Sequence, residues 1–364
     1  MLTRHFSRMP RLLRAAAFNV IGARNYTIRY GSEFNSHRRF IEASEQYSDD
    51  ERGAWRLARF RDLVRNAVDN TKYYRTRSEV YASVFHAKNI EEALSNIPTL
   101  DKKTFRDHSS HLLSKKYRTI ATSTTSGTTG MPMSVQHERR SLMRRFAFYH
   151  DHLSRSGIPF AAPSLRLSGR IISQSGDPRP YLYNFFEKQY FLPTYHLNET
   201  SAQAIFDFVH RVKPVFVDGY PSAIAQLVDL VSQKGPLPNS LRFAVTTAET
   251  LDPSVIERIS EPSGMKVLDY YSASEGLPFI QMCSHGNYHV RWQSGLFEVE
   301  RDGKFFQHGS GNLVVTSFVQ DRMPLIRYVT GDWVDGLEAN KDCPCGLRCA
   351  FRHIRSRVPT TYDQ

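Results

Sequence analysis

Residues 124–133 read TTSGTTGMPM, and this stretch decides the fold that we expect for the whole chain. Threonine and serine hydroxyls can donate hydrogen bonds to phosphate oxygens, and the glycines let backbone N–H groups come close to the same oxygens. A strand is expected over residues 117–122 and a helix over 137–153, so that a helix N-terminus would also attract the anion. The stretch therefore predicts a loop that holds the phosphates of a nucleotide.

Two other kinds of loop share part of this composition. A phosphate loop of the Walker A type requires a lysine after its last glycine, and Met131 follows Gly130 here, which excludes that class. A flexible linker rich in serine and threonine would look similar if the stretch stood alone. The other motifs of the chain decide between a linker and a binding loop.

The segment between residues 201 and 271 has the clearest alternation of helices and strands in the chain. Helices are expected over 201–211, 222–234 and 254–260, and short apolar strands over 215–218, 241–246 and 266–271. This alternation predicts a parallel sheet, and ligands of parallel sheets bind beyond the carboxyl ends of the strands. We therefore expect a ligand at residues 218–220, 246–249 and 269–275.

The segments on either side of this α/β region have different periodicities. Residues 36–115 have the periodicity of helices, whereas residues 288–334 alternate in the manner of antiparallel strands. Gly303, Gly309 and Gly311 are expected at the turns between those strands. The chain is thus expected to have a helical part, an α/β part and a β-rich part, in that order.

Two further motifs end predicted strands: residues 271–275 read YSASE, and residues 326–332 read IRYVTGD. Together with the loop they resemble the three main motifs of the adenylate-forming superfamily, which comprises acyl-CoA synthetases, luciferases and peptide-synthetase adenylation domains. Tyr220-Pro221-Ser222 and Thr247-Ala248-Glu249 match the same family in order and spacing. From about residue 40 to its end, the chain resembles the phenylacetate–CoA ligase branch, with its CapK-like and coenzyme F390 synthetase-like proteins.

The resemblance implies an α/β protein with the fold of the large N-terminal adenylate-forming domain. That fold has layered mixed and parallel sheets with helices, and a small β-barrel-like part. The implied parts are a basic N-terminal segment, a helical part, an α/β core that binds nucleotide and acid, a β-rich subdomain with a zinc site, and a hinge remnant. They cover residues 1–35, 36–115, 116–280, 281–354 and 355–364.

The implied activity is ATP- and Mg²⁺-dependent conversion of a carboxylic acid, aromatic or acyl, to an acyl-adenylate with release of pyrophosphate. The acyl group would then pass to CoA, an amine, a hydroxyl or a carrier protein. This chemistry requires no protein nucleophile, in line with the lack of a convincing Ser–His–Asp or Cys–His motif. Two alternatives stay open: adenylylation of a hydroxyl acceptor, as in F390 synthetase-like proteins, and a non-catalytic nucleotide-binding subunit.

The resemblance also assigns roles to single residues. Glu275 and Arg327 are the implied catalytic residues, Glu275 as a hard carboxylate that suits Mg²⁺ and Arg327 as a contact to phosphate or ribose. Tyr271 is implied to stack on adenine, and Asp332 to accept hydrogen bonds from both ribose hydroxyls. The other implied nucleotide-binding residues are Thr125, Ser126, Gly127, Thr128, Thr129, Gly130, Ala248, Glu249, Asp269, Tyr270, Ser272 and Arg357. The acid is expected to contact Phe146, Tyr149, His150, Gly219, Tyr220 and Pro221.

Two departures from the family pattern bear on the second half of the reaction. Relatives continue past the hinge for about a hundred residues as a small domain, whose lysine promotes adenylation, whereas this chain ends at Gln364. By this comparison the small C-terminal domain is absent from the chain, was removed, or is supplied by a separate partner chain. Ser272 and Ser356 stand where glycine is commoner, and a side chain is costly there at positive φ. Both departures weaken the expectation of CoA-ligase activity.

All four cysteines lie in the last quarter of the chain. In a chain without a secretion signal, such clustering points to a metal or to reduced thiols instead of a disulfide framework. We predict a structural Zn²⁺ in a closed tetrahedral site. The predicted ligands are Cys283, His289, Cys343 and Cys345. His285 and Cys349 are alternatives for the fourth ligand, and free thiols are the alternative to a metal.

The charge of the chain favours anionic partners such as nucleotides or acidic carrier proteins, because 364 residues carry a formal net charge of +12. No nucleic-acid-binding motif is present, and no apolar run of about 18 residues predicts a membrane-spanning helix. A cytoplasmic protein is expected, with a homodimer as a candidate assembly.

The first 32 residues carry six arginines and no acid. Their apolar residues are not cleanly segregated onto one helical face. We therefore favour a basic helix packed on the protein, with its arginines in solvent, over a targeting peptide or a helix on a membrane surface.

Overall fold

The computed structural model describes residues 4–124, 133–174, 177, 179–271, 273–338, 343–348, 350–351 and 353–356. The chain divides into two compact units, the first formed by Met1–Ile28 with His152–Tyr270 and the second by Arg29–Asp151 with Tyr271–Gln364. Each unit combines segments that are far apart in the sequence. This division differs from the consecutive blocks that the sequence suggested, because strands and helices pair with partners outside their own block.

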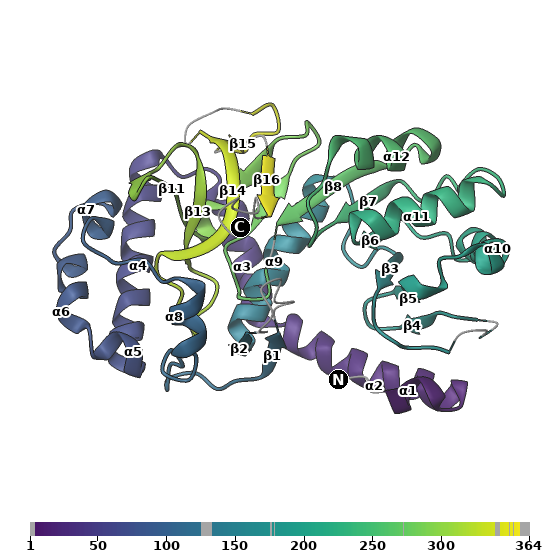
Figure 1. Ribbon diagram of the computed structural model, residues 1–364, viewed down its shortest axis with the longest axis horizontal. Coiled ribbons are helices and arrows are strands. Elements are labelled where there is room, and N and C mark those ends of the chain that lie inside the picture. Colours follow the sequence, from purple (N-terminus) through teal and green to yellow (C-terminus); the bar gives the residue numbers. More distant parts are fainter. Residues whose placement is uncertain are drawn as a thin grey trace, which may run out of the picture. The chain divides into compact units, whose positions relative to one another are not determined.

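The first unit contains a mostly parallel sheet with helices interleaved along the chain. The elements are β3 (Ser164–Ser168), β4 (Leu182–Asn184), β5 (Gln189–Pro193), α10 (Ala202–Val212), β6 (Phe216–Gly219), α11 (Pro221–Ser232), β7 (Phe243–Thr246), α12 (Pro253–Ser263) and β8 (Lys266–Tyr271). Their strands lie in the order β8-β7-β6-β3-β5-β4 (Figure 1). Only β4 runs antiparallel to its neighbour. The predicted α/β alternation of this region is therefore confirmed.

Local chemistry explains where the helices of this unit begin and end. Pro221 and Pro253 occupy the first turns of α11 and α12, where a missing N–H costs nothing. Gly264 ends α12 in the left-handed conformation with φ of 68°. All four residues of β6 and of β7 are buried, as in a strand covered on both faces. The apolar face of α11 packs on these strands through residues such as Ile224 and Val228.

Two N-terminal helices, α1 (Arg4–Arg8) and α2 (Arg11–Arg29), pack on the first unit. Phe6 and Phe18 are buried against Ile172 and Leu182. Arg14 is also buried, where it donates to the Ser7 carbonyl and forms a 2.9 Å ion pair with Asp177. The predicted packing of this segment is confirmed, but the prediction that its arginines lie in solvent is wrong for Arg14.

The second unit combines short helices with antiparallel sheets. Its helices are α3 (Ser32–Ser44), α4 (Asp49–Asn70), α5 (Lys72–Arg75), α6 (Ser78–Tyr81), α7 (Ile90–Leu94), α8 (Lys102–Asp107) and α9 (Arg139–Arg155). Its strands are β1 (Ala121–Thr124), β2 (Ser134–His137), β9 (Ile280–Met282), β10 (Tyr288–Val290), β11 (Gly295–Arg301), β12 (Lys304–Phe306), β13 (Gly309–Ser317), β14 (Tyr328–Leu337), β15 (Ala350–Phe351) and β16 (His353–Ser356).

Three groups of paired strands occur in this unit (Figure 1). The largest is an antiparallel sheet with five strands in the order β12-β11-β13-β14-β16. Strands β15, β10 and β9 pair in that order, and β1 pairs with β2. The antiparallel pattern predicted for residues 288–334 is confirmed. Within the described residues, no helix combines the length and the apolar character needed to cross a bilayer.

Two local expectations differ from the structure. The strand expected over 117–122 is β1 at Ala121–Thr124, because pairing with the short β2 sets its extent. Gly303 and Gly309 have positive φ angles of 74° and 96°, but Gly311 lies inside β13 and not at a turn. A Cβ at Gly311 would lie 2.6 Å from the Glu300 carbonyl oxygen, beside a shift in the β13–β14 register. Close approach of a neighbouring strand therefore explains this glycine.

Candidate functional site

The predicted phosphate loop, with Thr125, Ser126, Gly127, Thr128, Thr129 and Gly130, lies outside the described residues. Its two flanks are described: β1 ends at Thr124 and β2 begins at Ser134, and these residues pair in the antiparallel register. The stretch thus connects two paired strands. The expectation that a helix follows it directly was wrong, because β2 separates it from α9, and a strand of four residues leaves little periodic signal.

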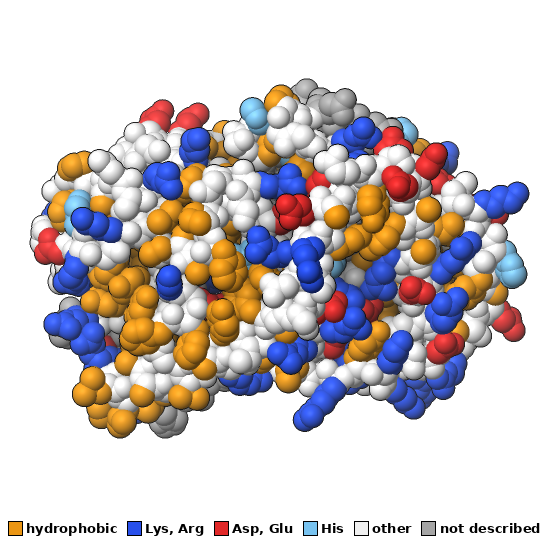
Figure 2. Space-filling view, turned by 180° about the vertical axis from the view of Figure 1, so that it is seen from behind, with side chains coloured by type: hydrophobic (Ala, Val, Ile, Leu, Met, Phe, Trp, Pro, Cys, Tyr) orange, Lys and Arg blue, Asp and Glu red, His pale blue; other side chains and the backbone are white. Residues whose placement is uncertain are grey.

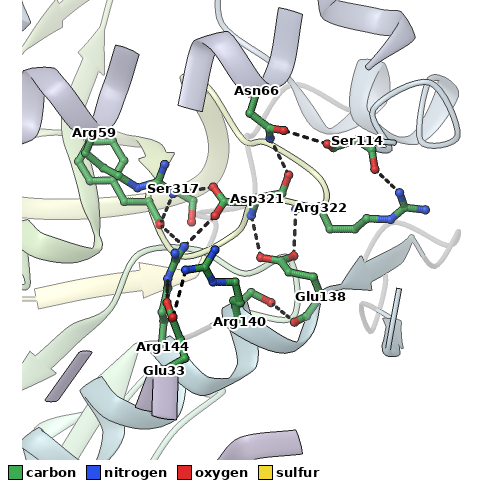
Figure 3. Close-up of polar contacts among 12 residues, drawn as sticks. Glu33, Arg59, Asn66, Ser114, Glu138, Arg140, Arg144, Ser317, Asp321 and Arg322 are labelled. Carbon is green, nitrogen blue, oxygen red and sulfur yellow. Dashed lines mark hydrogen bonds and ion pairs between the residues drawn. The ribbon is translucent and has the colours of Figure 1, made fainter. Parts of the chain in front are cut away.

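A buried polar network fixes the end of β2 within the second unit (Figure 3). Glu138 follows β2, and its carboxylate accepts hydrogen bonds from the backbone N–H groups of Asp321 (3.1 Å) and Arg322 (2.9 Å). The Asp321 carboxylate accepts from Arg59 (2.6 Å) and Arg144 (2.8 Å). Burial raises the pKa of Asp321, but the two guanidinium groups outweigh burial and hold that pKa below its usual value. The network holds the β1–β2 hairpin in one position relative to α4 and α9.

A second contact joins this hairpin to the residue that precedes Glu275. Ser123 Oγ donates to the Ser274 carbonyl oxygen at 2.9 Å and lies 2.7 Å from His137 Nε2. Burial, and then the charge of Arg145, lower the pKa of His137 to about 4, so its ring is neutral at pH 7. Ser123 and His137 were not among the predicted site residues. They belong to no motif, and only the β1–β2 register makes them diagonal neighbours on one face.

Tyr271 and Asp332, which were predicted to hold adenine and ribose, meet in the second unit. Tyr271 Oη donates to Asp332 Oδ2 at 2.6 Å. Burial, followed by the Asp332 charge and this hydrogen bond, raises the pKa of the Tyr271 phenol well above 10. The phenol therefore stays protonated at neutral pH and serves as the donor of the pair.

Glu275 is buried in the same unit, with 7% of its surface exposed. Burial raises the pKa of its carboxyl, and the Asp332 charge adds to this effect, while Lys102 and Arg145 lower the pKa. The Tyr328 hydroxyl donates to Glu275 only at 3.5 Å. A buried carboxylate with weak local compensation gains from a nearby cation. Its hard oxygens suit Mg²⁺, so the residue fits the predicted ion.

Arg327 places its guanidinium in a buried ion pair. Its Nε and Nη2 atoms donate to the two carboxylate oxygens of Glu298, both at 2.9 Å. Its Nη1 atom donates to the carbonyl oxygens of Leu94, at 3.3 Å, and Ile97. Both charged side chains are buried. These donors join β11 to the end of α7, and the contact of Arg327 with phosphate or ribose stays a prediction.

The first unit carries three further predicted nucleotide-binding residues at the ends of β7 and β8. Asp269 is buried and accepts a 2.6 Å hydrogen bond from Thr246 Oγ1. Ala248 has φ of 70°, a conformation that is costly for a residue with a Cβ and that is common at ligand sites. The Glu249 carboxylate accepts from the backbone N–H (3.2 Å) and hydroxyl (3.0 Å) of Ser222 in the first turn of α11. Glu249 thus caps a helix, a role that no motif indicated.

Tyr270 lies beside these residues at the end of β8. Its ring is 6.2 Å from that of His152, centroid to centroid, at an angle of 58°. Ser272 and Arg357, the remaining predicted nucleotide contacts, lie outside the described residues.

Three residues expected to contact the acid connect β6 to α11 in the first unit: Gly219, Tyr220 and Pro221. A Cβ at Gly219 would lie 3.0 Å from Leu167 Cβ, so a side chain would crowd the neighbouring strand. Pro221 is buried, whereas 41% of Tyr220 is exposed. Tyr220 is therefore the side chain of this group that a ligand can reach.

The other three expected acid contacts, Phe146, Tyr149 and His150, lie on α9 in the second unit. His150 is buried, and its Nε2 lies 3.0 Å from Tyr30 Oη. Burial, and then the charges of Arg38 and Arg29, lower the pKa of His150 to about 3. His150 is therefore a neutral hydrogen-bonding partner within an aromatic cluster and carries no charge toward an acid at pH 7.

The four predicted metal ligands converge in the second unit. The ligand atoms of Cys283, His289, Cys343 and Cys345 all lie within 4.8 Å of one another. Cys283 Sγ is 3.8 Å from Cys343 Sγ, and Cys345 Sγ is 3.4 Å from His289 Nε2. Two thiolates on a tetrahedral Zn²⁺ lie about 3.8 Å apart for Zn–S bonds of about 2.3 Å. The geometry therefore fits zinc.

The fold brings these ligands together from two places. Antiparallel pairing of β9 with β10 sets Cys283 and His289 at one end of the pair. A tight turn, in which Gly346 N–H donates to the Cys343 carbonyl at 2.8 Å, presents Cys343 and Cys345. The alternative ligand His285 is exposed, and Cys349 lies outside the described residues.

Comparison with known proteins gives one relative in sequence and several in structure, while no family model matches the chain. The protein CapK of Staphylococcus aureus is 23% identical over 278 residues, which are 72% of this chain and 60% of CapK. The chain thus spans less than two thirds of the length of CapK.

Crystal structures of 2-hydroxyisobutyryl-CoA ligase have the same fold as this chain. An open conformation in complex with 2-HIB-AMP and CoA has a TM-score of 0.69 and 20% identity. The matched region covers 88% of this chain and 79% of the ligase chain. A postadenylation state with R3-HIB-AMP has a TM-score of 0.67 and 18% identity, with coverages of 87% and 70%. These likenesses confirm the predicted α/β fold, which this chain shares with 2-hydroxyisobutyryl-CoA ligase.

Proposed function

We propose that this chain, a homologue of CapK with the fold of an adenylate-forming ligase, activates a carboxylic acid with ATP and Mg²⁺. The products would be an acyl-adenylate and pyrophosphate, and CoA is the first acceptor to test. The observation that carries the proposal is the 2.6 Å contact of Tyr271 with Asp332, in the unit that also buries Glu275. Residues from two distant motifs thereby come together as a nucleotide site requires.

Charge explains what the site has to accomplish. A carboxylate oxygen attacks the α-phosphorus of ATP, the bond from that phosphorus to the bridging oxygen breaks, and pyrophosphate leaves with the electron pair. Mg²⁺, when bound, offsets the repulsion between these anions. Glu275 would hold the ion, since burial raises the pKa of its carboxyl and a cation reverses that effect. The Tyr271–Asp332 pair would hold the nucleoside, with Asp332 as an acceptor for ribose hydroxyls.

Within the same unit, the β1–β2 hairpin would present the phosphate-binding loop. The hydrogen bond of Ser123 to Ser274 fixes one end of the hairpin next to the residue before Glu275. Glu138 fixes the other end through the backbone of Asp321. Positioning of this kind contributes to catalysis because it lowers the entropic cost of bringing reacting groups together.

A structural Zn²⁺ at Cys283, His289, Cys343 and Cys345 is the second part of the proposal. Three of the four residues are buried, and their four ligand atoms would fill all four positions of a tetrahedral ion, so that no position would be open to a substrate. The ion would fix β9 and β10 to the turn at Cys343 and would take no part in the reaction.

Pyrophosphate exchange with a panel of aromatic and aliphatic acids tests the function. We expect exchange with at least one acid, and a loss of at least about tenfold in Glu275→Gln, in keeping with the loss of a metal or transition-state contact. Glu91→Gln, at an exposed position of α7, is the matched control and should keep full activity. Equal exchange in the two variants would refute the role of Glu275.

Product mass separates the proposed reaction from its alternative. An acyl-adenylate hydrolyses, whereas adenylylation of a hydroxyl acceptor leaves a stable phosphodiester. ATP binding without any turnover would instead indicate a nucleotide-binding subunit.

A further inference from the structure

Helix α2 directs large apolar side chains away from the protein. Leu12, Leu13 and Val20 are 85%, 57% and 71% exposed, whereas Phe18 on the opposite side is 6% exposed. Leu12, Ala16 and Val20 follow one another at intervals of four residues and so form one stripe, with Leu13 beside it. We call Leu12, Leu13, Ala16 and Val20 the apolar face of α2. The apolar residues of α2 thus lie on two sides of the helix, as the sequence indicated, with Phe18 toward the protein and the apolar face toward solvent.

An aromatic hairpin tip between β4 and β5 is fixed beside α2. Phe185 is 69% exposed and Phe186 is 45% exposed. Asn19 of α2 holds this tip, since its Nδ2 donates to the Tyr183 carbonyl at 2.9 Å and its Oδ1 accepts from Phe185 N–H at 3.0 Å. The tip and the apolar face therefore belong to one surface of the first unit.

Close packing makes this arrangement rigid. A Cβ on Gly22 of α2 would lie 2.7 Å from Asn184 Oδ1, so glycine lets the helix approach the hairpin. The ring of Tyr26 lies 6.1 Å from that of Phe186, centroid to centroid. In Figure 2 hydrophobic side chains gather at the lower left, over the place where α1 and α2 lie when Figure 1 is seen from behind.

Positive charge surrounds the apolar face. Arg8, Arg11 and Arg24 are exposed on α1 and α2, and residues 1–32 contain no aspartate or glutamate. Arg14 is the one buried arginine of α2 and is paired with Asp177. An apolar stripe bordered by arginines matches the interface of a bilayer that contains anionic lipids, where apolar groups enter the acyl boundary and arginines meet phosphates.

We propose that α2 and the Phe185–Phe186 tip dock the first unit on an anionic membrane surface. The helix would lie in the plane of the interface, with its apolar face at the acyl boundary and its exposed arginines among the phosphates. Aromatic side chains at a loop tip suit the same depth, because their rings are at home at the boundary of headgroups and acyl chains. This inference does not depend on the proposed reaction.

Vesicle flotation of the full chain tests the proposal. We expect binding to vesicles of phosphatidylcholine mixed with phosphatidylserine, weaker binding to phosphatidylcholine alone, and release at high salt. Leu12→Ser combined with Val20→Ser should lower the partition coefficient at least about tenfold, because each side chain loses its apolar contribution. Val80→Ser is the matched control, since Val80 is 41% exposed on α6 in the other unit and should leave binding unchanged.

Charge is tested in a second arm. Arg11→Gln with Arg24→Gln should weaken binding to the mixed vesicles and flatten its salt dependence, while Arg65→Gln on α4 should have no effect. All of these side chains are exposed, so circular dichroism should show folded variants.

Three outcomes would overturn the proposal. The first is wild-type protein that fails to float with either vesicle, and the second is a double variant that floats as well as the wild type. The third is a dimer, seen by analytical ultracentrifugation, that dissociates in the Leu12→Ser, Val20→Ser variant without any vesicle binding. That result would assign the apolar face to a second copy of the chain.

Discussion

Replacing Arg327 by methionine separates a structural role from a catalytic one. In the structure the guanidinium makes two 2.9 Å hydrogen bonds to Glu298 and also donates to the carbonyl oxygens of Leu94 and Ile97. The two charged side chains are 6% and 5% exposed. Arg327→Met would therefore leave a buried carboxylate without its partner and would remove the side-chain donor of the Ile97 carbonyl, whereas the Leu94 carbonyl would still accept from Ile97 N–H at 3.1 Å.

The expected loss of stability follows from these contacts. An orphaned member of a buried ion pair costs about 3–5 kcal/mol. Loss of the donor to the Ile97 carbonyl adds about 1–3 kcal/mol. Arg327→Met with Glu298→Met removes the buried charge, and should recover the first loss but not the second. An exposed pair is the control: Arg65→Met breaks the 3.1 Å contact with Asp62 and should cost at most about 0.5 kcal/mol.

Urea denaturation followed by fluorescence measures these differences. Burial already raises the pKa of Glu298, with Arg327 opposing that rise. In Arg327→Met the folded-state pKa of Glu298 should rise further, so the variant loses stability as pH increases above the unfolded value near 4.5. Its deficit should therefore shrink as pH is lowered. A variant with an unchanged urea midpoint that has lost pyrophosphate exchange would refute this reasoning. That result would indicate that Arg327 contacts the phosphates of the nucleotide.

Three further outcomes are expected. Burial raises the pKa of Glu275, so the ionised carboxylate destabilises the folded, ligand-free protein above about pH 4.5. Glu275→Gln should therefore raise the urea midpoint at pH 7 and leave it unchanged at pH 4. Equal effects at both pH values would contradict this. Tyr271→Phe removes the 2.6 Å hydrogen bond to Asp332 and should weaken ATP binding roughly tenfold by calorimetry, with unaltered affinity as the contrary result. Cys345→Ser should abolish stoichiometric zinc in elemental analysis and lower thermal stability. A chelator should also lower the thermal stability of the wild type, and unchanged stability would show that no metal is bound.

Short-range patterns in the sequence were sufficient for much of the fold. The alternation of helices and strands predicted β6, β7 and β8 within two residues, because apolar runs bounded by proline and glycine restrict local structure strongly. The same patterns did not predict β2, a strand of four residues that forms by antiparallel pairing with β1. They also placed Gly311 at a turn, although a carbonyl of the neighbouring strand sets its need for glycine.

The residues of the candidate site could likewise be predicted from the sequence only in part. The Cys and His residues of the predicted zinc site could be chosen from spacing, because metal ligands occur in few combinations. Ser123 and His137 could not, since a serine and a histidine acquire a joint role only when strand register makes them neighbours.

By itself, the sequence determined the α/β fold class, the pairing of two motifs as candidate nucleotide contacts, and a set of candidate metal ligands. Only the tertiary structure decided that Arg327 binds Glu298, and that Leu12 and Val20 point outward while Arg14 is buried. The physical reason is that side-chain type restricts local conformation and chemistry. The partner of a charge and the exposed face of a helix depend on which distant segments pack against them.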